Sequence, residues 1–128
     1  MNALVRTVHG SWLVDLETEE LLESSEVEIE SQSGEVSLPR VVASARAGAT
    51  IAAIVDARPP LVISHDAGRT WREAGGGLPK GVAIAINDDN PDRILYAARN
   101  RLFLSSDGGR FWRGLTPELP EITAVSFE

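Results

Sequence analysis

An eight-residue segment that occurs twice constrains this chain more than any other feature. Residues 64–71 read Ser-His-Asp-Ala-Gly-Arg-Thr-Trp, and residues 105–112 read Ser-Ser-Asp-Gly-Gly-Arg-Phe-Trp, 41 positions later. The similarity extends outward, because Leu-Pro closes each copy at 78–79 and 119–120 and occurs once more at 38–39. A period of about 40 residues is typical of proteins made of stacked, similar units.

Apolar segments within each unit predict short β-strands. Residues 61–63 and 102–104 lead into the two repeated segments, and three further apolar segments occupy equivalent places, at 41–45, 82–86 and 123–127. Turn-forming residues separate them, and no stretch has the length and period of a helix. The sequence therefore predicts an all-β fold of about three four-stranded antiparallel sheets, each the size of a β-propeller blade.

We predict a single domain with a degenerate first unit, two regular units and an extra strand, at 1–40, 41–81, 82–121 and 122–128. Two arrangements of the first unit are open. Either the extra strand supplies its innermost strand, in this chain or in a partner, or residues 3–8 are that strand. The outer strand of this unit is either 21–22 or 27–29.

The repeated segment has the composition of a self-supporting turn. Its Asp carboxylate can accept hydrogen bonds from backbone N–H groups of the turn, and its Gly permits a positive φ. Its Trp covers the turn with a large apolar surface. We therefore assign structural roles to both copies, at Ser64, Asp66, Gly68, Trp71, Ser105, Asp107, Gly109 and Trp112.

Both segments match the pattern of the Asp box, or bacterial neuraminidase repeat. The wider layout resembles Asp-box propellers of three kinds: photosystem II assembly and stability factors, sortilin-like ectodomains and sialidases. The resemblance covers residues 41–128 well and residues 1–40 weakly. It implies a β-propeller in which the boxes are structural and lie away from any active site.

The sialidase resemblance implies an arginine triad, a Tyr–Glu pair and an acidic proton donor. The chain has one tyrosine, Tyr96, inside a predicted strand, and no nearby Glu repeats that pairing. We expect no catalytic residue and no cofactor. Ser64 and His65 are neighbours and point to opposite faces of a strand. The loop 87–92 could bind calcium through its oxygens, but an ordinary turn is preferred, and no metal site is predicted.

Charge and composition limit the partners. The net charge is −7, and residues 15–35 hold nine acidic and no basic residues. This stretch disfavours nucleic acid and is either a surface for a basic partner or a solvated polar face. Four arginines are interpreted as charges on edge strands, with an anion-binding stripe as the alternative: Arg69, Arg72, Arg110 and Arg113.

Neither an apolar run of membrane length nor a secretory signal pattern is present, so a cytoplasmic location is expected, with a secreted mature form as the alternative.

Closed propellers have 4–8 blades, and three blades leave two faces uncovered. We therefore expect two chains to form a six-bladed ring that acts as a non-catalytic protein-binding or assembly scaffold. The alternatives are a different protein partner, or a carbohydrate-binding or glycoside-processing site between the two chains.

Overall fold

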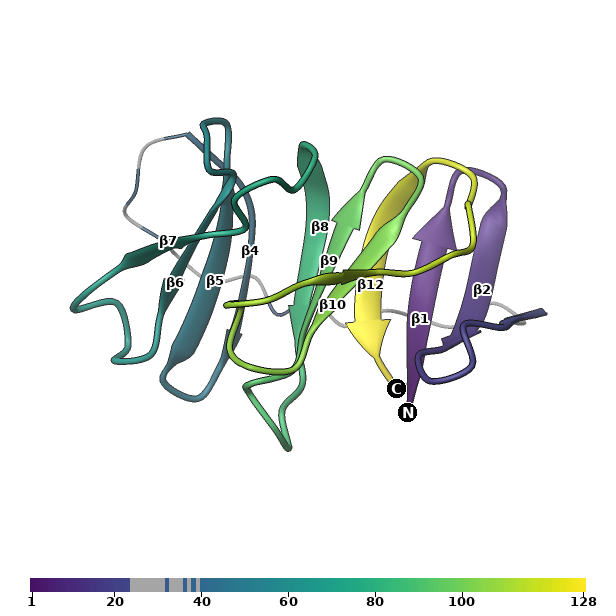
Figure 1. Ribbon diagram of the computed structural model, residues 1–128, viewed down its shortest axis with the longest axis horizontal. Helices are drawn as coiled ribbons and strands as arrows, with labels where there is room; N and C mark the ends of the chain where they lie inside the picture. The colour runs from purple at the N-terminus through teal and green to yellow at the C-terminus, as the bar shows by residue number, and fades with distance from the viewer. Residues whose placement is uncertain (24–31, 33–35, 37, 39) are drawn as a thin grey trace.

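A computed structural model describes residues 1–23, 32, 36, 38 and 40–128. These residues form twelve strands and no helix, so none of them belongs to a membrane-spanning helix. The strands build three antiparallel sheets of four strands each, which confirms the predicted fold class at this level. Figure 1 shows the sheets in a row, with the two chain ends side by side.

Each sheet is named here by its order along the chain. Sheet I contains, in spatial order, β12 (Ile122–Phe127), β1 (Asn2–Thr7), β2 (Gly10–Asp15) and β3 (Leu21–Glu23). Sheet II contains β4 (Val41–Ala47), β5 (Thr50–Val55), β6 (Leu61–Ser64) and β7 (Arg72–Ala74). Sheet III contains β8 (Gly81–Ile86), β9 (Ile94–Ala98), β10 (Leu102–Ser105) and β11 (Arg113–Gly114).

Sheet I is built from both ends of the described chain. Its innermost strand is β12, which pairs with β1 so that Val5 lies opposite Val125. Of the two arrangements that the sequence left open, the structure has the one in which the extra strand, β12, is the innermost strand of sheet I in the same chain. The outer strand is β3, whereas the alternative outer strand at 27–29 lies outside the described residues.

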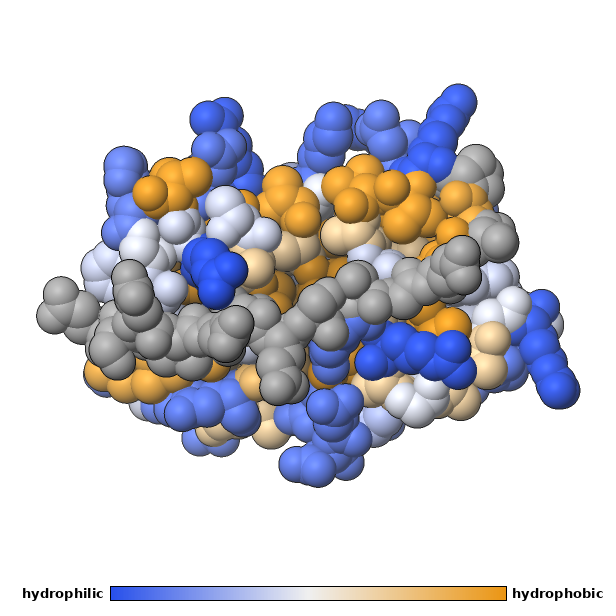
Figure 2. Space-filling view, turned by 180° about the vertical axis from the view of Figure 1, so that it is seen from behind, coloured by the Kyte–Doolittle hydropathy of each residue, from blue (hydrophilic) through white to orange (hydrophobic). Residues whose placement is uncertain are grey.

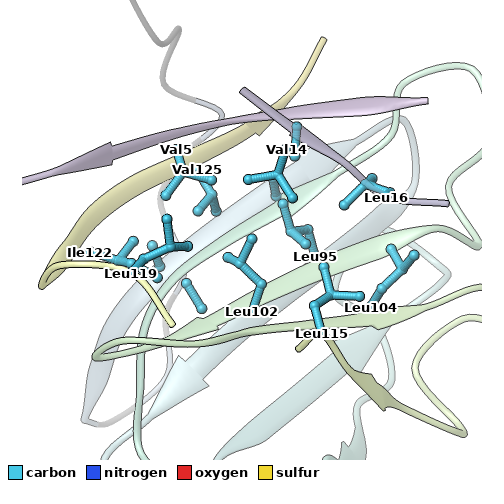
Figure 3. Close-up of a cluster of buried hydrophobic side chains, with 14 residues drawn as sticks. Val5, Val14, Leu16, Leu95, Leu102, Leu104, Leu115, Leu119, Ile122 and Val125 are labelled. Atoms are coloured by element: carbon cyan, nitrogen blue, oxygen red, sulfur yellow. The ribbon is translucent and has the colours of Figure 1, made fainter. Parts of the chain in front are cut away.

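Sheet III occupies the middle of the row and packs on both neighbours. One of its faces meets sheet I in an apolar cluster that includes Val5, Val14, Leu95 and Leu104 (Figure 3). Its other face meets sheet II in a second cluster, which includes Ile63, Ile84 and the fully buried Tyr96. The core is therefore two layers of side chains between three stacked sheets.

The three innermost strands share one irregularity. Each has a break in its pairing register near its start, and the extra residues are Val42, Val82 and Thr123. These strands lie side by side, with β8 between β4 and β12. Gln32 reaches the middle one, because its side-chain amide donates to Ile86 O (2.8 Å) and accepts from Ile86 N (3.0 Å). This residue of the connection between β3 and β4 therefore satisfies one position of the open edge of β8.

Candidate interaction surface

The first repeated turn, residues 64–71, is held by a short network of side-chain bonds. Ser64 Oγ donates to Asp66 Oδ1 (2.7 Å) and accepts from Gly68 N (2.8 Å). Asp66 Oδ1 also accepts from Thr70 N (2.9 Å), and the Thr70 hydroxyl donates to the other carboxylate oxygen. The bonds from Thr70, together with that from Ser64, hold the pKa of Asp66 far below its ordinary value.

The second turn, residues 105–112, repeats this arrangement. Ser105 Oγ donates to Asp107 Oδ1 (2.8 Å) and accepts from Gly109 N (2.9 Å). Asp107 Oδ1 accepts from Phe111 N (3.0 Å), and this bond and that from Ser105 lower the pKa of Asp107. The bridging role of the two serines was not predicted from the sequence, although their repetition 41 residues apart was a usable signal.

The glycines and tryptophans of these turns also serve the turns themselves. Gly68 and Gly109 have φ of 90° and 91°, in the region that side chains resist. A ring carbon of Trp71 lies 3.6 Å from where a Cβ on Gly68 would sit, and Trp112 Nε1 donates to Gly109 O (3.0 Å). All eight residues singled out in the sequence thus lie in two local turns.

These contacts predict an acid-dependent loss of stability. A carboxyl group with a lowered pKa in the folded protein stabilises it above the ordinary Asp value of about 3.9, and this contribution disappears as the pH falls through the lowered value. Urea unfolding should be measured at pH 7 and at steps down to pH 2.5. The double variant Asp66→Asn/Asp107→Asn should be less stable than the wild type at pH 7, and its free energy of unfolding should fall less as the pH is lowered. The control is the double variant Asp88→Asn/Asp89→Asn, which removes the same charge from another loop. Equal acid sensitivity in the wild type and both double variants would contradict the prediction.

The other chemically suggestive residues also serve local structure. His65 Nδ1 lies 3.3 Å from Thr50 Oγ1, while Ser64 bonds within its own turn. In the loop 87–92, Asn87 Oδ1 accepts from Asp89 N (2.8 Å) and from Asn90 N (3.2 Å). Within the described residues, no three His, Cys, Asp or Glu side chains are grouped as metal ligands would be.

Two of the arginines interpreted as edge-strand charges instead connect sheets. Arg72, on the outer strand of sheet II, donates to Gly108 O of sheet III (2.8 Å). Arg113, 41 residues later, donates to Leu16 O of sheet I (2.8 Å) and lies 3.6 Å from Glu19. The edge-strand interpretation was therefore incomplete for Arg72 and Arg113, because sequence proximity does not reveal which turn of the next sheet an arginine reaches.

The pairing registers define a row of equivalent residues across each sheet, which we call the forward row. In sheet II it is Ala45, Ala52, Ile63 and Arg72. In sheet III it is Ala85, Leu95, Leu104 and Arg113. The row of sheet II faces sheet III, because its apolar members belong to the cluster between these sheets and Arg72 bonds a turn of sheet III. The row of sheet III faces sheet I in the same way, through the other cluster and the bond from Arg113.

Sheet I has the equivalent row on the face that no other sheet of the described chain contacts. By register its members are Ser126, Leu4, Leu13 and Leu22. Sheet III is the only sheet that packs on sheet I within the described chain, and it covers the opposite face, which includes Val5 and Val14. None of the three leucines is buried, and Leu22 is 42% exposed. We call Leu4, Leu13 and Leu22 the leucine row.

A second group of exposed apolar residues lies at one end of the inner strands. Val42 and Val82 are the second residues of β4 and β8, and Val8 lies beside the start of β12 through its bond to Glu121 O (3.0 Å). Figure 2 shows hydrophobic residues gathered along the upper part of the rear surface. Isolated exposed valines are common on protein surfaces, so the leucine row, which spans three strands, is the better candidate for an interaction surface.

Comparison of the sequence with protein-family models and with curated proteins finds no match. The Asp-box resemblance therefore rests on the two repeated segments themselves.

Proposed function

We propose that this chain is a non-catalytic assembly scaffold, made of Asp-box propeller blades, that works as a homodimer. The observation that carries the proposal is the leucine row. Its counterparts pack on a neighbouring sheet, that of sheet II on sheet III and that of sheet III on sheet I, whereas no sheet of the described residues packs on the leucine row. Burying such an apolar face removes it from water and stabilises an assembly by roughly 25 cal/mol for each Å² buried.

The repeat geometry supports the ring that the sequence suggested. Three sheets related by one repeated packing mode form an arc, and repeat proteins are stable when the end faces of such an arc are covered. Two arcs of three sheets make six, which lies within the range of closed propellers. A twofold dimer is the commonest way for a single chain to provide the missing half.

Light scattering behind size-exclusion chromatography tests the proposal directly. We expect a mass of twice the 13.8 kDa of one chain at micromolar concentrations. A monomer throughout that range would overturn self-assembly as the basis of function. Saturable binding on a glycan array, or turnover of a fluorogenic sialoside, would overturn the non-catalytic scaffold and favour a carbohydrate-directed protein.

A further inference from the structure

We propose that a cavity beside the loop 56–60 binds a carboxylate that carries a small apolar group. The cavity has a volume of about 260 Å³ and lies between this loop, which joins β5 to β6, and the connection from β7 to β8. Figure 1 shows both segments at the upper edge of the molecule. The site is contained in one protomer, so it goes beyond the proposed scaffold and does not depend on the homodimer.

The cavity combines an apolar part with a charged part. The buried Pro60 and the partly buried Val55 and Leu78 form the apolar part. Three exposed side chains form the charged part: Asp56, Arg58 and Lys80. An apolar lining with a few polar groups is typical of ligand sites, and drug-sized ligands occupy about 300–1,000 Å³. This cavity is slightly smaller, so it fits a small acid or a single terminal residue.

The charges around the cavity favour a singly charged anion. Among the described residues, the guanidinium of Arg58 has neither a hydrogen bond nor an ion pair. Lys80 Nζ lies 3.7 Å from Asp56 Oδ1, and its side chain remains 79% exposed. An arginine can donate two parallel N–H bonds to one carboxylate. Asp56 repels negative charge, so a carboxylate suits this site better than a doubly charged phosphate.

The corresponding turn of sheet III, at 99–101, is closed against the segment that follows β11. Leu119 N donates to Asn100 O (2.8 Å), and Asn100 Nδ2 donates back to Leu119 O (3.0 Å). Ile122 N donates to Arg99 O (2.8 Å). Arg99 Nε also lies 3.4 Å from a carboxylate oxygen of Glu121. In sheet III, the arginine of this turn therefore already has an acidic partner.

Sheet II differs from sheet III at each of these points. The loop 56–60 has five residues against three in the turn of sheet III, and it contains no asparagine. Leu78 N donates to Gly75 O (3.0 Å), within its own turn. Lys80 follows Leu-Pro exactly where Glu121 does in sheet III, so the acid is replaced by a second cation. A bound carboxylate would supply the negative charge that Glu121 supplies in sheet III.

Titration followed by nuclear magnetic resonance tests the site with N-acetyl-leucine as the probe. We expect a dissociation constant of about 1 mM, as for a small ligand in a shallow site. The shifted backbone amides should be those of residues 55–58, 78 and 80. The neutral N-acetyl-leucine amide has the same apolar group and should bind at least about tenfold more weakly, because it lacks the charge. Equal binding of the acid and the amide would overturn the proposal.

The repeat offers matched variants for the charged groups. Arg58→Gln should weaken binding of N-acetyl-leucine about tenfold. Lys80→Glu introduces the acid found in sheet III and should abolish detectable binding. Arg99→Gln is the control and should leave binding unchanged, because Arg99 is paired with Glu121. All three altered side chains are exposed, so the amide spectrum away from each site should stay that of the wild type. Unchanged binding by Arg58→Gln, or an equal loss in Arg99→Gln, would overturn the assignment.

A peptide distinguishes the two sources of such a carboxylate. A tetrapeptide of three glycines and a terminal leucine presents the same group at a chain end. Tighter binding of this peptide than of N-acetyl-leucine would support a site for the C-terminus of a partner, and equal binding would support a site for a free acid. Light scattering reports on the homodimer separately. A monomer that binds N-acetyl-leucine would overturn the homodimer and leave this site standing.

Discussion

Gly109→Ala should lower the free energy of unfolding by about 3 kcal/mol. The residue has φ of 91°, where an alanine is strained. A Cβ at this position would also overlap Ile63 Cδ1, which projects from sheet II. The two costs add, because the turn cannot relax away from Ile63 without opening the contact between sheets II and III. Equilibrium unfolding in urea measures the loss.

Gly68→Ala is the matched control for this prediction. Gly68 is equivalent in sequence and conformation, with φ of 90°. The nearest atoms to a Cβ there are 3.6 and 3.8 Å away, in Trp71 and Ile51, so only the backbone strain remains. We expect a loss of about 1 kcal/mol. Equal losses at the two glycines would contradict the packing of Ile63 against the second turn. Combining Ile63→Ala with Gly109→Ala should give a loss smaller than the sum of the two single losses, because the shortened side chain no longer meets the new Cβ.

Tyr96→Ala should cost about 4 kcal/mol, because it empties the centre of the cluster between sheets II and III. The side chain is fully buried, and its ring meets Phe103 and Trp112 edge to face at 6.3 and 5.9 Å between centroids. Its hydroxyl donates to Pro79 O (2.6 Å), and burial raises the pKa of Tyr96 to about 12. Guanidinium unfolding followed by tryptophan fluorescence measures the change.

Tyr96→Phe separates the ring from the hydroxyl. Removing the hydroxyl leaves Pro79 O without this donor and should cost about 1 kcal/mol. A loss as large as that of Tyr96→Ala would show that the hydrogen bond, and not the packed ring, holds the cluster together. Ultraviolet titration gives an independent check, since the phenol should stay protonated well above the ordinary tyrosine value of about 10.

The strands could be predicted because each signal was local and occurred more than once. Residues 61–63 and 102–104 were expected to lie in strands and belong to β6 and β10, and the segments at 41–45 and 82–86 became β4 and β8 with small extensions. The inner strand of sheet I could not be decided from sequence, because residues 3–8 and 123–127 have similar apolar patterns. Their pairing joins segments more than a hundred residues apart, which no local pattern specifies.

The candidate surface was harder to predict. Leu4, Leu13 and Leu22 read as ordinary strand residues, and only the registers of β1, β2 and β3 place them in one row. The bond from Arg72 to Gly108 O was hidden for the same reason, because its partner belongs to another sheet. The sequence predicted uncovered end faces from the number of units, but it did not reveal which residues form them.

The pairing of β1 with β12 has a consequence for how the protein acquires its structure. Sheets II and III are each continuous in the chain and can form as soon as their own strands exist. Sheet I must wait for β12, so during synthesis its first hairpin remains without a partner while the rest of the chain is made. Domains dominated by such distant pairings fold slowly. We therefore expect β1 to β3 to be the last part to become protected from hydrogen exchange during refolding, and the first to lose protection when the chain opens.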